Sequence, residues 1–242
     1  MGELRIIPVT GIGEINRADD LAGMICDAVT QMGEQILDRD VLVVTQKIVS
    51  KAEGAMEQVD PSDPLSHKPL VERESVRIVR RRGDLIISET KHGFVCANAG
   101  IDLSNVESGW AALLPDDPDR SARRIRDGVR GRCGADTAVI VSDTFGRTWR
   151  RGVTDVAIGS AGITAVLDLR GSRDAYGREL QVTEVAIVDE IAGAADLVMG
   201  KATGVPVAIV RGVDESAFIS ERAARSSVAA DLVRKPSEDL FR

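Results

Sequence analysis

The chain has few aromatic side chains and no long apolar run. Phe, Trp and Tyr make up only 3% of its 242 residues, which argues against a wall of stacking rings for single-stranded nucleic acid. The formal net charge of −7 argues against general binding to a phosphate backbone, so we expect no nucleic-acid partner. No apolar run approaches the ~18 residues of a membrane-spanning helix, and the N-terminus lacks the pattern of a signal peptide. We therefore expect a cytoplasmic protein with no membrane partner.

Cysteine is also scarce, and the common phosphate-binding motif is missing. Cys26, Cys96 and Cys133 are far apart without a C-x-x-C pair, which is neither a disulfide framework nor a zinc site. No G-x-x-x-x-G-K-[ST] string occurs, so a nucleoside triphosphate is not expected to bind through a P-loop. The string Gly11-Ile12-Gly13 begins like a dinucleotide fingerprint, but Asn16 stands where the third glycine belongs. What remains is a tight turn whose amides are free to face an anion.

Apolar runs alternate with amphipathic stretches, which predicts an α+β protein with mixed sheets and helices. The order of elements does not show whether the main sheet is parallel. His67, in a loop rich in Pro and Asp, is expected to be exposed. Strands are predicted over residues 6–9, 41–45, 85–88, 93–97, 138–141 and 207–210. Helices are predicted from residue 19 to 32, up to Arg80-Arg81-Arg82, from a Ser121 cap to residue 132, after residues 185–189 to about residue 200, and over residues 215–232.

Two polar segments have the composition of a metal–phosphate site. Residues 98–105 bring Asp102 and nearby Ser and Asn oxygens together, a set that suits Mg²⁺ or Mn²⁺; an Asx turn explains the same pattern, and spacing alone favours the turn. Asp143 and Thr144 follow the predicted strand 138–141, at the strand end where α/β proteins gather ligands. The three arginines beyond them, Arg147, Arg150 and Arg151, suit phosphate or carboxylate oxygens, although a solvated basic loop explains them equally well.

Two further features have both a functional and a structural interpretation. Lys51 follows the predicted strand 41–45 closely enough to neutralise a phosphate, but a surface lysine is the more common case. Asp189 and Glu190 open a helix, where they either complement its positive end or support a metal site. No Ser/His/Asp or Cys/His arrangement can be assembled, which argues against nucleophilic catalysis.

Several of these strings together resemble, in order, the signatures of the coenzyme F420-0:L-glutamate ligase family. They are VTQKIVSKAEG (44–54), NAGIDLSN (98–105), DTFGRTWRRG (143–152), YGREL (176–180), DEIA (189–192) and Met199-Gly200. The resemblance covers nearly the whole chain. In one branch of the family the ligase is fused to a nitroreductase-like domain, and the sequence leaves open whether this chain is such a half.

The resemblance implies a reaction and its participants. It implies a ligase that uses GTP to activate the terminal carboxylate of the deazaflavin F420-0 as an acyl phosphate. The amine of L-glutamate then attacks, GDP and phosphate leave, and further γ-linked glutamates can follow. It also implies Mg²⁺ or Mn²⁺ with K⁺, a homodimer, and a ligase unit over residues 1–242 with two subdomains, residues 1–85 with 180–242 and residues 86–179.

The resemblance also assigns roles to individual residues. It implies metal binding by Asp102, Asp143 and Thr144, and catalytic roles for Asp143, Arg147 and Arg150. Lys201 stands where we expect an acidic residue, which leaves the ligands of a second metal ion open. The residues implied to contact nucleotide are Ile12, Gly13, Glu14, Ile15, Gln46, Lys47, Lys51, Asn105, Lys201 and Gly204. Two alternatives remain: a ligase for another phosphorylated acceptor, and a catalytically silent domain that binds the deazaflavin.

Overall fold

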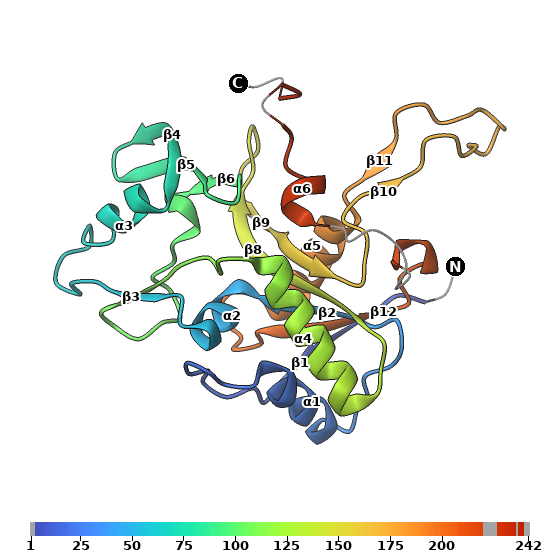
Figure 1. Cartoon of the computed structure of the whole chain (residues 1–242), viewed down its shortest axis with the longest axis horizontal. Coiled ribbons are helices and arrows are strands. Elements are labelled where there is room, and N and C mark those ends of the chain that lie inside the picture. The colour runs from blue at the N-terminus through green and yellow to red at the C-terminus, as the bar shows by residue number, and fades with distance from the viewer. Residues whose placement is uncertain (1–2, 220–226, 236, 240–242) are drawn as a thin grey trace.

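A five-stranded mixed sheet lies at the centre of the protein (Figure 1). The computed structural model describes residues 3–219, 227–235 and 237–239. The strand order is β1-β12-β2-β8-β9, and β2 with β8 is the parallel pair while the other neighbours are antiparallel. The predicted α+β class with mixed sheets is confirmed. The strands are β1 (Arg5–Val9), β2 (Val41–Thr45), β8 (Ala138–Gly146), β9 (Val153–Ala161) and β12 (Val207–Arg211).

The inner strands of this sheet each contain an apolar run of four residues because both of their faces are covered there. Residues 41–44 of β2, 138–141 of β8 and 207–210 of β12 have no exposed surface. Helix α1 (Leu21–Gln31) packs on α4 (Pro118–Cys133), which packs on β8 and β9, and α5 (Ile187–Met199) packs on β9 and β12. The predicted strands 6–9, 41–45, 138–141 and 207–210 are therefore confirmed, and β8 runs on to residue 146.

Helix α4 begins earlier than its predicted cap. The Asp117 side chain accepts a hydrogen bond from the Arg120 amide at 2.8 Å, and Pro118 occupies the first turn, where its missing N–H costs nothing. Ser121 is therefore inside the helix, and its hydroxyl donates to Glu53 Oε1 at 2.7 Å. The start of α4 lies so close to β9 that a Cβ at Gly159 would be 2.3 Å from the Pro118 carbonyl carbon, so only glycine fits there.

A smaller region with its own core lies beside the central sheet. Strands β4 (Ser75–Arg82), β5 (Leu85–Thr90) and β6 (Val95–Ala97) form one sheet, and β3 (Met56–Gln58) pairs with β7 (Trp110–Ala112). The elements around them are α2 (Gln46–Glu53), α3 (Lys68–Arg73) and the short 3-10 helix η1 (Asn98–Gly100). A second cluster of buried side chains fills this region: Val71, Ile86, Ala99, Ile101, Ala111 and Leu113.

Two predictions for this region are wrong. The helix expected up to Arg80-Arg81-Arg82 ends at Arg73, and residues 75–82 form strand β4. Two register shifts between β4 and β5 interrupt the alternation that identifies a strand. His67 is buried, with 7% of its surface exposed, and desolvation lowers the pKa of its imidazole. The predicted strand 85–88 is confirmed within β5, and the predicted strand 93–97 is confirmed over residues 95–97.

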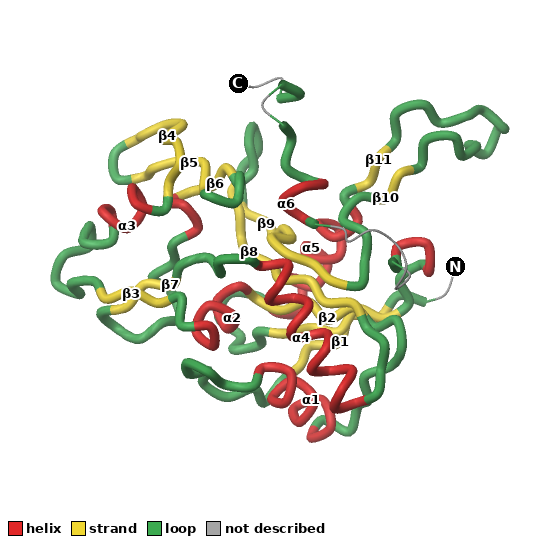
Figure 2. The backbone as a smooth tube through the Cα atoms, viewed as in Figure 1, coloured by secondary structure: helices red, strands yellow, loops and turns green. Residues whose placement is uncertain are grey.

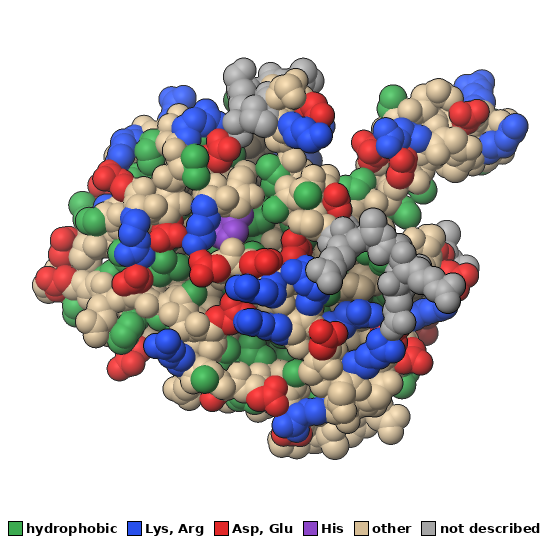
Figure 3. Space-filling model, in the orientation of Figure 1, with side chains coloured by type: hydrophobic (Ala, Val, Ile, Leu, Met, Phe, Trp, Pro, Cys, Tyr) green, Lys and Arg blue, Asp and Glu red, His purple; other side chains and the backbone are tan. Residues whose placement is uncertain are grey.

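The long connection between β9 and α5 forms an arm that projects from the body (Figures 1 and 2). Its base is the short pair β10 (Leu167–Asp168) and β11 (Glu184–Val185). Arg170 bridges the two strands, with its guanidinium 2.6 Å from Asp168 and 3.2 Å from Glu184. The arm carries side chains of both charge signs (Figure 3).

The remaining elements are short. Of the predicted final helix 215–232, the structure shows the 3-10 helix η2 (Glu215–Ala217) and α6 (Val228–Asp231), and residues 220–226 lie outside the described part. Cys26 and Cys96 are buried and Cys133 is exposed, each as a free thiol. Within the described ranges, every helix is too short or too polar to cross a membrane.

Candidate active site

A cleft of about 1310 Å³ opens at the edge of the central sheet where β2 and β8 come to their ends. The parallel register places Thr45 beside Ser142, so the start of α2 and the outer part of β8 meet at one edge, as ligand-binding segments do in α/β folds. The cleft is lined by parts of the turn 12–17, the start of α2, the loop 102–107, the β8–β9 hairpin and the loop 200–206.

The start of α2 ties the central sheet to the smaller region. The buried Gln46 amide nitrogen donates to Ser50 Oγ at 2.6 Å and to the Leu113 carbonyl at 2.7 Å. Ser50 Oγ donates to the same carbonyl at 2.5 Å. Gln46 lines the cleft, but its donors hold the two regions together, so its side chain fixes the geometry of the cleft floor.

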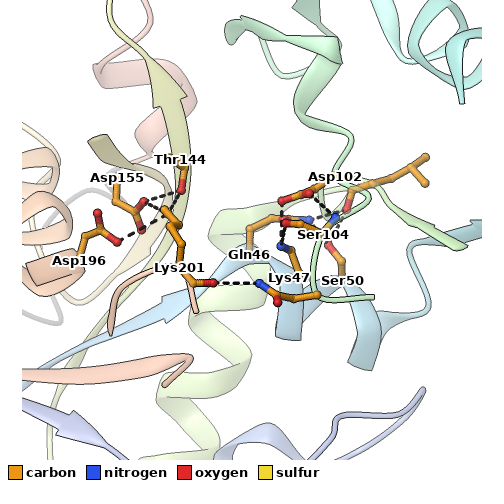
Figure 4. Close-up of polar contacts among 11 residues, drawn as sticks. Gln46, Lys47, Ser50, Asp102, Ser104, Thr144, Asp155, Asp196 and Lys201 are labelled. Carbon is orange, nitrogen blue, oxygen red and sulfur yellow. Dashed lines mark hydrogen bonds and ion pairs between the residues drawn. The ribbon is translucent and has the colours of Figure 1, made fainter. Parts of the chain in front are cut away.

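One side of the cleft carries the Lys47 cluster, which consists of Lys47, Asp102 and Ser104 (Figure 4). Lys47 Nζ lies 2.8 Å from Asp102 Oδ2 and 3.0 Å from Ser104 Oγ. The Ser104 amide donates to Asp102 Oδ1 at 2.7 Å, so the predicted Asx turn is present. Burial raises the pKa of Asp102, but the hydrogen bonds from Lys47 and the Ser104 amide outweigh it, and the net pKa lies below the ordinary value.

The opposite side carries the Lys201 cluster, which consists of Lys201, Thr144, Asp155 and Asp196 (Figure 4). Lys201 Nζ lies 2.8 Å from Asp155 Oδ1 and 3.6 Å from Asp196 Oδ1, and it donates to Thr144 Oγ1. Thr144 Oγ1 donates to Asp155 Oδ1 at 2.7 Å, and Ser142 Oγ donates to Asp155 Oδ2 at 3.1 Å. Both oxygens of the buried Asp155 carboxylate are therefore hydrogen-bonded.

Asp143 lines the cleft with both clusters. Its pKa is raised to about 7, first by desolvation and then by the negative charges of Asp102 and Asp155. Two carboxylates near one another in a desolvated site favour either a shared proton or a bound cation. Asp102 and Asp143 are therefore candidate ligands for a divalent cation.

The donor set fits a hard cation only with help from substrate oxygens. Within the described residues, no three His, Cys, Asp or Glu side chains gather closely enough to hold a metal ion. Mg²⁺ commonly binds to one or two carboxylates together with substrate phosphates and water. Asp102 and Asp143 could supply those two carboxylates, whereas the predicted ligand Thr144 has its hydroxyl hydrogen-bonded to Asp155 and Lys201 in the opposite cluster.

All the residues predicted to contact nucleotide line this cleft. Lys51 Nζ donates to Glu14 in the turn 12–17, and the Asn105 amide nitrogen donates to the Lys201 carbonyl at 3.2 Å. The second bond joins the loop that follows η1 to the loop that precedes β12. The lining residues among those predictions are Ile12, Gly13, Glu14, Ile15, Gln46, Lys47, Lys51, Asn105, Lys201 and Gly204.

The predicted arginines lie outside the cleft lining. Arg147 and Arg150 are in the exposed turn of the β8–β9 hairpin, beyond the lining residue Val153. The Arg147 guanidinium donates to the Arg151 carbonyl at 2.7 Å, so it closes the turn. The structure thus places these arginines beyond the rim and does not bring them to the carboxylates.

Asp155 is a buried residue at the cleft that the sequence did not lead us to predict. A carboxylate inside the apolar strand VTDVAIGSA is a signal that could have identified Asp155, because a buried charge needs partners.

The role of Asp189 only partly matches its predicted alternatives. Asp189 lies in the first turn of α5, and its carboxylate accepts a hydrogen bond from the Ala157 amide at 2.9 Å. It therefore joins α5 to β9 and does not line the cleft.

Comparison with known proteins identifies the family. The sequence model for F420-0:gamma-glutamyl ligases matches residues 11–212. The chain is 43% identical to the coenzyme F420:L-glutamate ligase of Methanothermobacter thermautotrophicus, over 99% of each chain. It is 43% identical to the enzyme of the same name from Methanopyrus kandleri, over 99% of this chain and 98% of the other, and 40% identical to that of Methanocaldococcus jannaschii, over 86% of each. The chain belongs to the F420-0:gamma-glutamyl ligase family.

Proposed function

We propose that this chain forms an amide between the amine of L-glutamate and the terminal carboxylate of the deazaflavin F420-0, with GTP as the energy source. The observation that supports this most directly is the cleft itself. It gathers the Asp102 and Asp143 carboxylates with the ammonium groups of Lys47, Lys51 and Lys201. Carboxylates for a divalent cation and lysines for phosphates are what phosphoryl transfer needs.

The proposed reaction has two steps. An oxygen of the acceptor carboxylate attacks the γ-phosphorus of GTP, the bond from that phosphorus to the β-phosphate oxygen breaks, and GDP leaves with the electron pair. The glutamate amine then attacks the carbonyl carbon of the acyl phosphate, loses a proton, and displaces phosphate. The first step depends mainly on positioning and on neutralising charge.

The chain's own residues have distinct parts in this proposal. A divalent cation, Mg²⁺ or Mn²⁺, would supply Lewis-acid stabilisation of phosphate oxygens, and Asp102, Asp143 and Thr144 would hold it. Lys47, Lys51 and Lys201, which form ion pairs with carboxylates in the cleft, neutralise phosphate charge. The turn 12–15 and Asn105 contact the nucleotide. Arg147 and Arg150, at the exposed turn beyond the rim, act on the acidic groups of the acceptor rather than on the reacting phosphorus.

The proposal also covers properties of the protein beyond the reaction itself. We infer further γ-linked glutamate addition, a requirement for K⁺, a homodimer and a cytoplasmic location from the family resemblance. The division into two subdomains, residues 1–85 with 180–242 and residues 86–179, likewise stays a prediction.

The test is a mass-spectrometric assay with F420-0, L-glutamate, GTP and Mn²⁺. The expected result is a product heavier by one or more glutamyl units, with GDP released in proportion. The Asp143→Ala variant should lose at least ~10³-fold in rate, because it removes charge from the site of phosphoryl transfer. Asp127→Ala, which removes an exposed carboxylate on α4 away from the cleft, is the matched control. Folded wild-type protein that gives no mass shift would refute the assignment.

A further inference from the structure

The Lys201 ammonium group lies in a pocket of oxygen atoms from three different elements. Thr144 belongs to β8, Asp155 to β9 and Asp196 to the last turn of α5, and each presents an oxygen to Nζ. An arrangement of carboxylate and hydroxyl oxygens around one point is typical of a hard-cation site. In this protein the Lys201 ammonium group occupies the position of such a cation.

Two contacts hold Lys201 in place, one to its ammonium group and one to its backbone carbonyl. Asp155 has 3% of its side chain exposed and sits opposite Thr144 in the β8–β9 register, so its carboxylate cannot swing away. The Lys201 carbonyl accepts the Asn105 amide at 3.2 Å, which fixes the backbone of the loop 200–206. The lysine side chain is nevertheless 55% exposed, and Lys201 lines the cleft.

Lys201 also keeps the capacity to bind a phosphate oxygen. A lysine ammonium has three N–H donors, and two of them go to Thr144 and Asp155. Asp196, at 3.6 Å, is too far for a hydrogen bond. The third donor therefore remains for a ligand in the cleft.

The charges beside Asp155 disfavour a second divalent ion there. The Lys201 ammonium group already supplies a positive charge 2.8 Å from Asp155 and 3.6 Å from Asp196. A second divalent ion at Asp155 would lie within contact distance of the Lys201 ammonium and would be repelled by it.

From this geometry we infer that Lys201 is a built-in cation that takes the place of a second divalent ion, so the chain binds one Mg²⁺ or Mn²⁺ with its nucleotide. The ion at Asp102 and Asp143 and the Lys201 ammonium then flank the nucleotide phosphates, as paired ions do in two-metal sites. Thr144 Oγ1, which donates to Asp155 and accepts from Lys201, has a second lone pair for the ion. The inference rests on the proposed function only in placing the nucleotide phosphates in this cleft.

The experiment is a titration of the full chain with Mn²⁺ in the presence of GDP, with free Mn²⁺ followed by electron paramagnetic resonance. Wild-type protein should bind one Mn²⁺ per chain, and Lys201→Arg, which keeps the charge, should do the same. Lys201→Glu adds a carboxylate to Asp155 and Asp196 and should bind two. Lys235→Glu, at an exposed lysine outside the cleft, should bind one.

Either of two results would overturn the inference. Wild-type protein with two bound ions would show that Lys201 does not exclude a second ion, and this measurement needs no variant to fold. Folded Lys201→Glu with a single ion would show that the oxygen pocket is not a cation position. The proposed function is tested separately, since wild-type protein that binds two ions and still adds glutamate to F420-0 retains that function while refuting the single-ion inference.

Discussion

The two clusters that face each other across the cleft hold similar groups in different ways. In the Lys47 cluster, the Asp102 side chain is 37% exposed and sits on a loop joined to β7 by an isolated bridge at Ala112. In the Lys201 cluster, the Asp155 side chain is 3% exposed and lies inside β9. The lysines show the reverse order, with Lys47 17% and Lys201 55% exposed. The Asp102 carboxylate is thus open to a ligand, whereas the Asp155 carboxylate is closed in by its own hydrogen bonds. Burial and register, more than residue type, separate a carboxylate that binds ligands from one that fixes geometry.

The largest expected effect is on activity at the exposed cluster. Asp102→Ala should lower kcat by roughly 10³-fold, because it removes one of two carboxylates proposed to hold the divalent cation. Its effect on the free energy of unfolding should be about 1 kcal/mol and smaller than that of Asp155→Ala, because Asp102 is 37% exposed and water can replace part of its contact with Lys47. Steady-state kinetics and urea denaturation measure the two quantities. Wild-type kcat in this variant would contradict the contrast between the clusters.

The second effect is on stability at the buried cluster. Asp155→Ala should lower the free energy of unfolding by about 2 kcal/mol, because Ser142, Thr144 and Lys201 lose their shared acceptor. Urea denaturation beside Asp102→Ala gives the comparison directly. Asp155→Asn, which keeps an acceptor oxygen, serves as the milder variant and should lose less. Equal losses for Asp155→Ala and Asp102→Ala would remove the distinction drawn from burial.

The third effect is the pH dependence of metal affinity at Asp143, which lines the cleft together with residues of both clusters. The pKa of Asp143 is raised from 3.8 to about 7, and a divalent cation needs the ionised form. Mn²⁺ affinity should therefore rise by up to about tenfold per pH unit toward pH 7 and level off above it. Calorimetric titration with GDP present at several pH values measures this, and Asp127→Asn should leave the profile unchanged. An affinity that does not change with pH below pH 7 would disprove it.

The same carboxyl group affects stability without metal, with the opposite dependence. Between its ordinary pKa of 3.8 and its folded value of about 7, the folded chain holds a proton that the unfolded chain releases. The contribution of Asp143 to the free energy of unfolding therefore falls as the pH rises through that window. Asp143→Asn should flatten this part of the profile in metal-free urea denaturation.

The smallest effect is expected at the exposed arginine turn, which belongs to neither cluster. Arg150→Ala should raise KM for F420-0 by about 3- to 10-fold and leave kcat nearly unchanged, since the arginine is proposed to attract the acceptor's acidic groups before and during the reaction alike. Arg80→Ala, an exposed arginine on β4, is the control. An unchanged KM for F420-0 in Arg150→Ala would indicate that the turn is only a solvated basic loop.

Much of the central sheet and of the cleft could be predicted from sequence. The runs 41–44, 138–141 and 207–210 are apolar throughout, which identifies buried strands. The family strings contain four of the lining residues predicted to contact nucleotide, Gln46, Lys47, Lys51 and Asn105. Strand β4 could not be identified by its pattern because its bulges break the alternation. Asp155 could not be placed because only the antiparallel register shows that it faces Thr144. His67 looked exposed because its neighbours are polar, while tertiary packing covers it.

The strand order has a consequence for how the chain folds. Strand β12 lies between β1 and β2, yet residues 207–211 are synthesised long after residues 5–45. During synthesis, β1 and β2 therefore cannot pair with each other in their native places. The strand that lies between them, β12, is the last strand of this sheet to be made. Contacts of such high sequence separation slow folding, and unpaired strand edges promote aggregation while they wait. Until residues 207–211 emerge, β1 therefore has no partner in this sheet, and β2 has only β8.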